Sequence, residues 1–195
     1  MRNEANSALW NSFKQGSWEA YTSLYNDYYG ALNNYGYKFT RNSNLIEDAI
    51  HDLFVRLWTT RTNLGEPASI KNYLYKSLRN TLIRKIKNEE KYTGIDADEY
   101  PLGFEVSYNN QADLAIEEKE FREKVKAVIN TLPPRQKEII YLRFYEGLSY
   151  DEIADIMSIG INSAYKMLYK ALENLQQTLG PSQLLSILLG LQYFL

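Results

Sequence analysis

The stretch from Leu132 to Gln176 restricts the fold of this 195-residue chain more than any other part of the sequence. It runs LPPRQKEIIYLRFYEGLSYDEIADIMSIGINSAYKMLYKALENLQ and is typical of a helix, a capped second helix, a tight turn and a third helix. Ser149 and Glu152 have the spacing of a capping box, in which each side chain accepts a hydrogen bond from the other residue's backbone amide. The pattern therefore predicts a helix-turn-helix.

The third helix of this stretch has an apolar face and a polar face. The predicted inward stripe is Ile161, Ala164, Leu168, Ala171, Leu172 and Leu175. Asn162, Ser163, Lys166 and Lys170 then point outward, and short polar or cationic side chains on a protruding helix suit a DNA groove. Paired amphipathic helices also occur in helical proteins that bind no nucleic acid, so the pattern alone leaves that alternative open.

Helical periodicity dominates the rest of the chain, and alternating strand-like segments are nearly absent. Apolar residues recur at helical spacing from Tyr21 to Phe39, with Gly30 and Gly36 weakening that helix locally. A second helix is predicted from Asn44 to Thr60, and Ser69 can cap a third that runs to about Asn88. The predicted fold class is all-α, with two small helical domains joined by an acidic flexible linker.

Charge is distributed unevenly along the chain, although the formal net charge is only -2. Lys and Arg outnumber Asp and Glu by 12 to 7 over residues 1–88, acids dominate by 9 to 1 over residues 89–118, and residues 119–195 carry 9 bases and 8 acids. The predicted domains are residues 1–88 and 114–180, separated by a linker at 89–113 and followed by an apolar tail at 181–195. A C-terminal domain this close to neutral should bind free DNA weakly and need a large partner.

The predicted third helix is rich in cations and free of acids. It carries Lys71, Lys76, Arg79, Arg84, Lys85 and Lys87. Asn72, Lys76, Arg79, Asn80 and Lys87 are predicted to lie on roughly one side. A solvated helix usually mixes its charge signs, so this face favours contact with nucleic acid.

No catalytic or metal-binding constellation is evident in the sequence. His51 is the only histidine, there is no cysteine, and the glycines lack the spacing of a phosphate or dinucleotide loop. We therefore expect no enzyme activity, no cofactor, no metal and no small-molecule substrate. The lack of cysteine, of a signal peptide and of a long apolar run predicts a cytoplasmic protein without membrane insertion.

The C-terminal motif resembles the DNA-binding domain of bacterial sigma factors, and the short, extracytoplasmic-function (ECF) type fits best. The resemblance follows the order Leu132-Pro133-Pro134, Arg135-Gln136, Arg143, Glu146 to Tyr150, and Glu152-Ile153-Ala154. It implies that the helix beginning near Ile161 enters the major groove of the upstream promoter element. Asn162, Ser163 and Lys166 would be closest to the bases, Lys170 would lie near phosphate, and Tyr169 would join them.

The N-terminal half resembles the same family independently. The segment Ile46 to Trp58, IEDAIHDLFVRLW, looks like the helix of the family that binds core polymerase, and Asp48, His51 and Asp52 would make that contact. Tyr73-Leu74-Tyr75 and Arg79-Asn80 resemble the adjacent helix, which binds the downstream element and its melted strand. The implied downstream residues are Asn72, Tyr73, Lys76, Arg79, Asn80 and Lys87. The tyrosines could instead be core aromatics, above all Tyr75.

The resemblance implies a promoter-specificity subunit that brings core RNA polymerase to promoter DNA, aids melting, and has an anti-sigma factor as a further partner. Tyr165 and Met167 depart from the family, which often has basic residues there, so upstream contact should be weaker or more apolar. The tail is expected either to cover a binding face or to complete the C-terminal core. A response-regulator type transcription factor and an all-helical interaction module are the competing interpretations.

Overall fold

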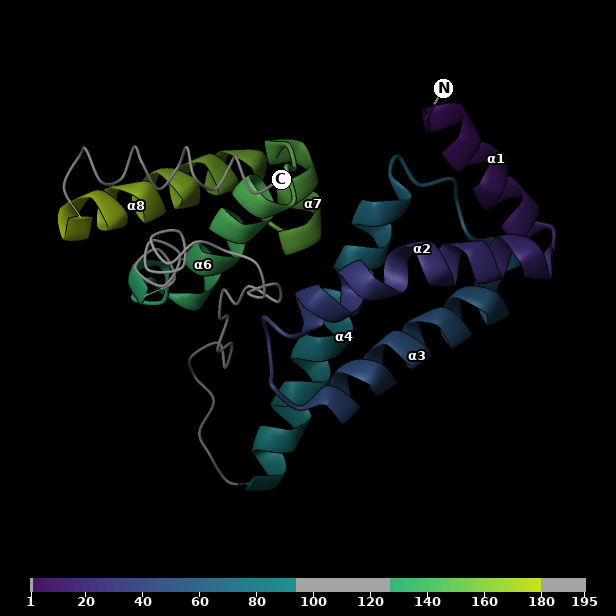
Figure 1. Ribbon diagram of the computed structural model, residues 1–195, viewed down its shortest axis with the longest axis horizontal. Coiled ribbons are helices and arrows are strands. Elements are labelled where there is room, and N and C mark those ends of the chain that lie inside the picture. Colours follow the sequence, from purple (N-terminus) through teal and green to yellow (C-terminus); the bar gives the residue numbers. More distant parts are fainter. Residues whose placement is uncertain (1, 94–126, 180–195) are drawn as a thin grey trace, which may run out of the picture. The chain divides into compact units, whose positions relative to one another are not determined.

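A computed structural model of the protein describes residues 2–93 and 127–179, all of them in helices and the connections between helices (Figure 1). The predicted all-α class is confirmed. The chain divides into two compact units, Met1–Pro101 and Leu102–Leu195. The predicted linker beyond residue 93 and the tail at 181–195 lie outside the described residues.

The first unit contains four α-helices among its described residues. They are α1 (Arg2–Lys14), α2 (Trp18–Gly36), α3 (Ser43–Thr60) and α4 (Ile70–Thr93), with a short 3-10 turn, η1 (Arg61–Asn63), after α3. The predicted third helix is α4, and it continues past its predicted end near Asn88. Side-chain caps begin three of these helices: Ser17 accepts from Ala20 N at 3.1 Å, Asn42 from Leu45 N at 3.2 Å, and Ser69 from Asn72 N at 3.3 Å.

Aromatic and aliphatic side chains from all four helices form the core of the first unit. Trp10 and Phe13 of α1 are almost fully buried, although no helix was predicted before Tyr21. Tyr35 and Tyr75 are both inaccessible and stack with ring centroids 4.7 Å apart, which joins α2 to α4. Among the tyrosines of α2, Tyr35 is therefore a core residue, whereas Tyr25 is 37% exposed and lies at the edge of the core.

The two glycines of α2 have opposite surroundings. Gly30 is exposed, and a β-carbon placed on it would meet nothing within 4 Å. Gly36 is buried where α2 approaches α3, and a β-carbon there would come within 2.5 Å of Ile46 Cγ2. Gly36 therefore permits a close helix contact in which an added β-carbon would force Ile46 to shift, whereas no atom lies close enough to Gly30 to require a glycine there.

The second unit consists, over its described residues, of α6 (Pro134–Ile140), the π-helical turn η2 (Tyr141–Tyr145), α7 (Tyr150–Met157) and α8 (Ile161–Leu179). Its core contains Ile139, Ile140, Leu142, Ile153, Ile156, Ala164, Leu168, Ala171 and Leu175. Asn174 Nδ2 of α8 donates to Gln136 Oε1 of α6 at 2.9 Å. This part-buried polar contact adds direction to the apolar packing of α6 on α8.

Candidate nucleic-acid interface

The helix-turn-helix begins with the predicted capping box at the start of α7. Glu152 N donates to Ser149 Oγ at 3.3 Å, and Ser149 N donates to Glu152 Oε2 at 2.8 Å. The helix ends at Ser158, whose left-handed backbone (φ 53°) turns the chain sharply. Ser163 N and Ala164 N then donate to Gly160 O, which starts α8. The predicted helix, turn and helix are thereby confirmed.

Helix α8 exposes every residue that the sequence assigned to the upstream element. Ala164, Leu168, Ala171 and Leu175 face the core, as predicted. Ile161 does not, because it is 45% exposed and lies at the very start of the helix, beyond the edge of the packed core. The exposed set is Asn162, Ser163, Lys166, Tyr169 and Lys170.

A stack of three side chains connects η2, α7 and α8. The Tyr150 and Tyr165 rings lie 25° from parallel with centroids 3.8 Å apart, and the Arg143 guanidinium carbon lies 5.0 Å from the Tyr150 centroid. Arg143 Nη1 also donates to the carbonyl oxygen of Leu148 at 2.8 Å. Sequence reasoning identified Tyr165 as unusual but not its partner, since the two tyrosines are brought together only by the turn.

Helix α4 corrects two of the predicted downstream residues. Asn80 and Lys87 are exposed, and Tyr73 and Lys76 are half-buried, so these four are accessible on one side. Asn72 is only 8% exposed and Arg79 only 2%. Both lie on the same face of α4 as Tyr75, Leu82 and Ile86, and this face packs against the other helices of the first unit. Neither can contact DNA without moving, and Tyr75 is a core residue.

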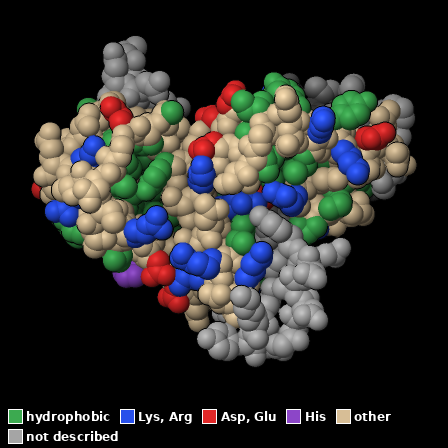
Figure 2. Space-filling view, turned by 180° about the vertical axis from the view of Figure 1, so that it is seen from behind, with side chains coloured by type: hydrophobic (Ala, Val, Ile, Leu, Met, Phe, Trp, Pro, Cys, Tyr) green, Lys and Arg blue, Asp and Glu red, His purple; other side chains and the backbone are tan. Residues whose placement is uncertain are grey.

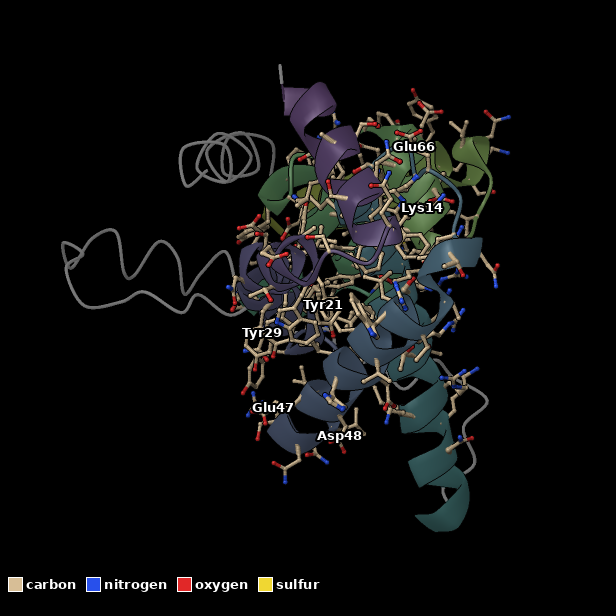
Figure 3. All side chains as sticks on the ribbon, turned by 90° about the vertical axis from the view of Figure 1, so that its right-hand side faces the viewer. Lys14, Tyr21, Tyr29, Glu47, Asp48 and Glu66 are labelled. Atoms are coloured by element: carbon tan, nitrogen blue, oxygen red, sulfur yellow. The ribbon has the colours of Figure 1, made fainter. Side chains whose placement is uncertain are left out.

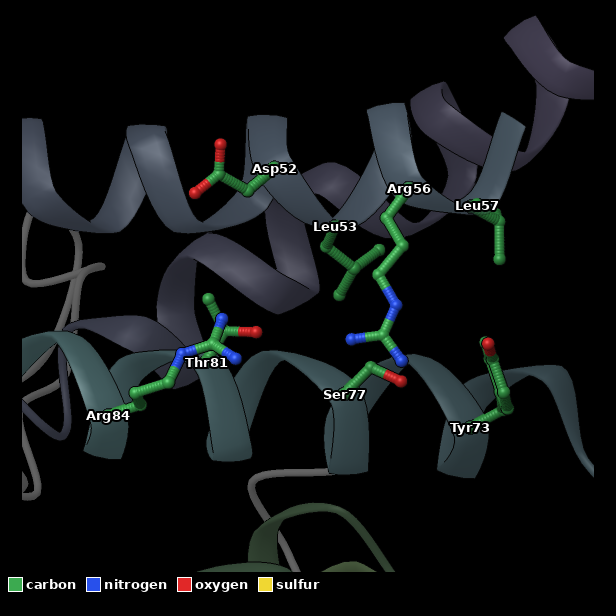
Figure 4. A pocket seen from close by; sticks show the side chains of 8 residues that line it. All are labelled: Asp52, Leu53, Arg56, Leu57, Tyr73, Ser77, Thr81 and Arg84. Carbon is green, nitrogen blue, oxygen red and sulfur yellow. The ribbon is translucent and has the colours of Figure 1, made fainter. Parts of the chain in front are cut away.

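A hollow lies between α3 and α4 (Figure 4). Its lining is Asp52, Leu53, Arg56, Leu57, Tyr73, Ser77, Thr81 and Arg84. The Arg56 side chain reaches from α3 toward Ser77, and the Arg84 side chain lies beside Thr81 on α4. Asp52 Oδ2 lies 2.8 Å from Lys85 Nζ, so the carboxylate is already compensated. The two guanidinium groups and the neighbouring hydroxyls are chemically suited to an oxyanion.

The predicted polymerase-binding residues form an exposed row on α3. Asp48, His51 and Asp52 are all exposed, as is Glu47 beside them. Glu47 and Asp48 project from the first part of α3 in Figure 3. Burial raises the pKa of Tyr29 above its usual value, and the Glu47 carboxylate and nearby tyrosines act in the same direction. The Glu47 and Asp48 carboxylates give this end of α3 its acidic character.

On the face seen in Figure 2, basic side chains do not form one continuous patch within either unit. In the view of Figure 2, Lys and Arg side chains lie in small groups, with Asp or Glu beside several of them.

None of the described helices combines the length and the apolar character that a bilayer crossing requires. Groups of three or more potential metal ligands are likewise absent from the residues that the structure describes.

Fold and exposed residues together define the class of this protein: an all-helical, two-unit protein whose second unit is a DNA-binding helix-turn-helix. Residues 24–92 match the family model of sigma-70 region 2, and residues 122–175 match that of sigma-70 region 4. The two matches together span more than half of the chain. The chain belongs to the sigma factors of RNA polymerase, of the ECF type.

Curated relatives extend over most of the chain. RNA polymerase sigma factor YlaC of Bacillus subtilis is 24% identical over 82% of this chain and 92% of its own length. The ECF RNA polymerase sigma-E factor of Haemophilus influenzae is 25% identical, with 89% of this chain and 95% of the relative covered. Members of this family direct RNA polymerase to promoters, and this chain has that function.

Two solved structures share the fold. CnrH, solved with the cytosolic domain of CnrY, covers 90% of this chain and 97% of its own with a TM-score of 0.59 and 16% identity. Sigma factor RpoE of Bartonella quintana, solved with the anti-sigma factor NepR, covers 76% of this chain and 89% of its own with a TM-score of 0.56 and 19% identity. At these identities the likeness is one of fold.

Proposed function

We propose that this sigma factor divides its work between its units, with the first holding core polymerase and the melted downstream element and the second reading the upstream element. The observation that carries the proposal is α8, which is buried on one side and exposes Asn162, Ser163, Lys166, Tyr169 and Lys170 on the other. The opposite face of this helix packs on α6 and α7 and fixes its position in the unit. A helix presented in this way fits the width of the major groove.

In the second unit, Asn162 and Ser163 stand in the first turn of α8, which is the part of a recognition helix nearest to base edges. Lys166 follows one turn later, and Lys170 another turn later, where its cation is suited to phosphate. Acids and bases are almost balanced in this half of the chain. Binding therefore depends on the polymerase to hold the second unit close to the promoter.

In the first unit, the exposed side of α4 is proposed to follow the downstream strand. Tyr73, Lys76, Asn80 and Lys87 would contact it, and the half-buried Tyr73 ring offers an unstacked base a surface. Asn72 and Arg79 would act from within, as residues that position α4. The predicted domain limits at residues 88 and 114 remain part of this proposal.

The Arg56 and Arg84 pair adds a contact that sequence reasoning missed. We propose that a backbone phosphate of the downstream strand occupies the hollow between α3 and α4, with guanidinium and hydroxyl donors around it. Its support is the lining itself, in which two cations face a space whose only acid is paired with Lys85. Such a contact positions the strand and carries no sequence information.

Core polymerase is proposed to bind the acidic row of α3. Asp48, His51 and Asp52 are exposed on the same helix as Glu47, and this row would suit a basic surface on the partner. An anti-sigma factor is a further proposed partner, since the solved relatives of this fold include a complex of that kind. Since core polymerase works in the cytoplasm, we place this protein there too, acting by binding and without catalysis.

The deciding experiment reconstitutes the chain with core polymerase and measures promoter-specific initiation. Association with core and initiation at defined sites are expected. A protein that binds promoter DNA without core would instead favour a free-standing regulator, although residues 2–93 contain none of the strands that a receiver domain needs. A protein that binds neither would be an interaction module, and the proposal would be rejected.

A further inference from the structure

An exposed apolar stripe runs along α8 beside the proposed base-reading residues. The described residues contain six large hydrophobic side chains that are exposed, and three of them are Ile161 at 45%, Tyr165 at 50% and Tyr169 at 74%. They stand four residues apart, so they form one line on the helix surface. Exposed apolar groups in a line of this kind indicate a contact surface.

The centre of this stripe is held in place before any ligand arrives. Tyr165 stacks on Tyr150 at 3.8 Å, and Arg143 covers the Tyr150 ring. Arg143 is itself fixed by its hydrogen bond to the carbonyl oxygen of Leu148. An aromatic ring fixed by a stack has little conformational entropy to lose on binding, so it suits a specific contact.

The stripe lies on the side of α8 that would face base edges. At about 100° per residue, Tyr169 lies within about 20° of Asn162 around the helix axis, and Tyr165 within about 60°. Lys166 and Lys170 are exposed on the same helix and complement phosphate charge. If α8 enters the major groove, the stripe cannot stay in solvent and must meet base edges beside those that Asn162 reads.

The major groove presents one apolar group, the C5-methyl group of thymine. We infer that Tyr165, with Ile161 and Tyr169, recognises thymine methyl groups in the upstream promoter element. This inference rests on the proposed function, because it requires α8 to bind DNA. It gives this sigma factor an apolar component of specificity at a position where cations are more usual in its family.

The test uses holoenzyme assembled from the full chain and core polymerase, on a promoter from which it initiates. Each thymine of the upstream element is replaced in turn by deoxyuridine, which lacks only the methyl group. At one or more positions, the replacement should weaken promoter binding about fourfold, the effect of one buried methyl group. Tyr165→Ala should bind thymine and deoxyuridine templates equally at that position, while Tyr165→Phe should keep the discrimination.

Ile161→Ala removes an exposed side chain without breaking the stack, so it tests the stripe even where Tyr165→Ala impairs folding. Equal binding of thymine and deoxyuridine templates at every position by the wild-type holoenzyme would overturn the inference. So would discrimination that survives in Tyr165→Ala, Ile161→Ala and Tyr169→Ala alike. If Lys170→Ala still weakens promoter binding when the thymine inference fails, the proposed function stands. A holoenzyme that shows no promoter-specific binding would reject both the inference and the proposed function.

Discussion

The two glycines of α2 give opposite stability predictions for the same substitution. Gly30→Ala should stabilise the first unit by about 0.5 to 1 kcal/mol, because alanine favours the helix and reduces the entropy of the unfolded chain. Nothing lies within 4 Å of the added carbon. Gly36→Ala brings the same gain, but its added carbon would lie 2.5 Å from Ile46 Cγ2. The sign at Gly36 therefore depends on whether Ile46 can move.

Ile46 has little freedom to move. Its side chain is fully buried, and a β-branched residue in a helix has one strongly preferred rotamer. Forcing a methyl group into such a site costs about 1 to 3 kcal/mol. The helix-propensity gain cancels when the two variants are compared, so Gly36→Ala should be less stable than Gly30→Ala by about 1 to 3 kcal/mol.

Urea unfolding followed by tryptophan fluorescence can measure this difference. All three tryptophans, at positions 10, 18 and 58, lie in the first unit, so the signal does not report the second. With a slope of roughly 1 kcal/mol/M, the unfolding midpoints should differ by roughly 1 to 3 M. Adding Ile46→Ala removes the clashing carbon, so the double variant should lose less stability than the sum of the single losses. Equal midpoints for the two alanine variants would refute the packing argument.

Three further predictions concern the proposed interfaces and the cap of α7. Lys170→Ala should lower holoenzyme binding to all DNA sequences, and it should reduce by about one the slope of the logarithm of the binding constant against the logarithm of the salt concentration. Asn162→Ala should mainly relax the preference for particular bases. Identical behaviour of the two variants would mean that the assigned face of α8 is wrong. Arg84→Ala should reduce the same slope, measured for promoter binding, by about one. If the variant instead loses its association with core polymerase, the hollow contacts the polymerase and not the DNA. Ser149→Ala removes the acceptor for Glu152 N and should destabilise α7 by about 1 kcal/mol, measured as faster hydrogen exchange of its amides; unchanged exchange would contradict the capping argument.

Local signals in the sequence were sufficient for much of this architecture. The capping box of Ser149 and Glu152, the cap at Ser69 and the apolar period of α3 depend on residues three or four apart, and all three are confirmed. The outward face of α8 follows from the same period. What these features share is that neighbouring residues decide them, so no knowledge of the tertiary structure is required.

The failures have a tertiary origin. Helix α1 has a weak pattern of its own, and it is held by the burial of Trp10 and Phe13 against other helices. Arg79 was assigned to a surface because it is a cation in a basic helix, yet its position in the helical repeat places it inside. The hollow at Arg56 and Arg84 combines two helices, and the stack of Tyr150 on Tyr165 spans a turn. Neither arrangement has a signature in residue spacing.

The π-helical turn at Tyr141–Tyr145 has a consequence for how the lengths of related sequences can vary. Glu146 N donates to Tyr141 O, five residues back, and Leu148 N donates to Leu142 O. A turn closed in this way contains one residue more than an α-helical turn. Chains that lack one residue between Ile140 and Gly147 can therefore form an ordinary turn and still begin the next helix from the same place. We therefore expect that related sequences one residue shorter lack that residue in this turn, and not within α7 or α8.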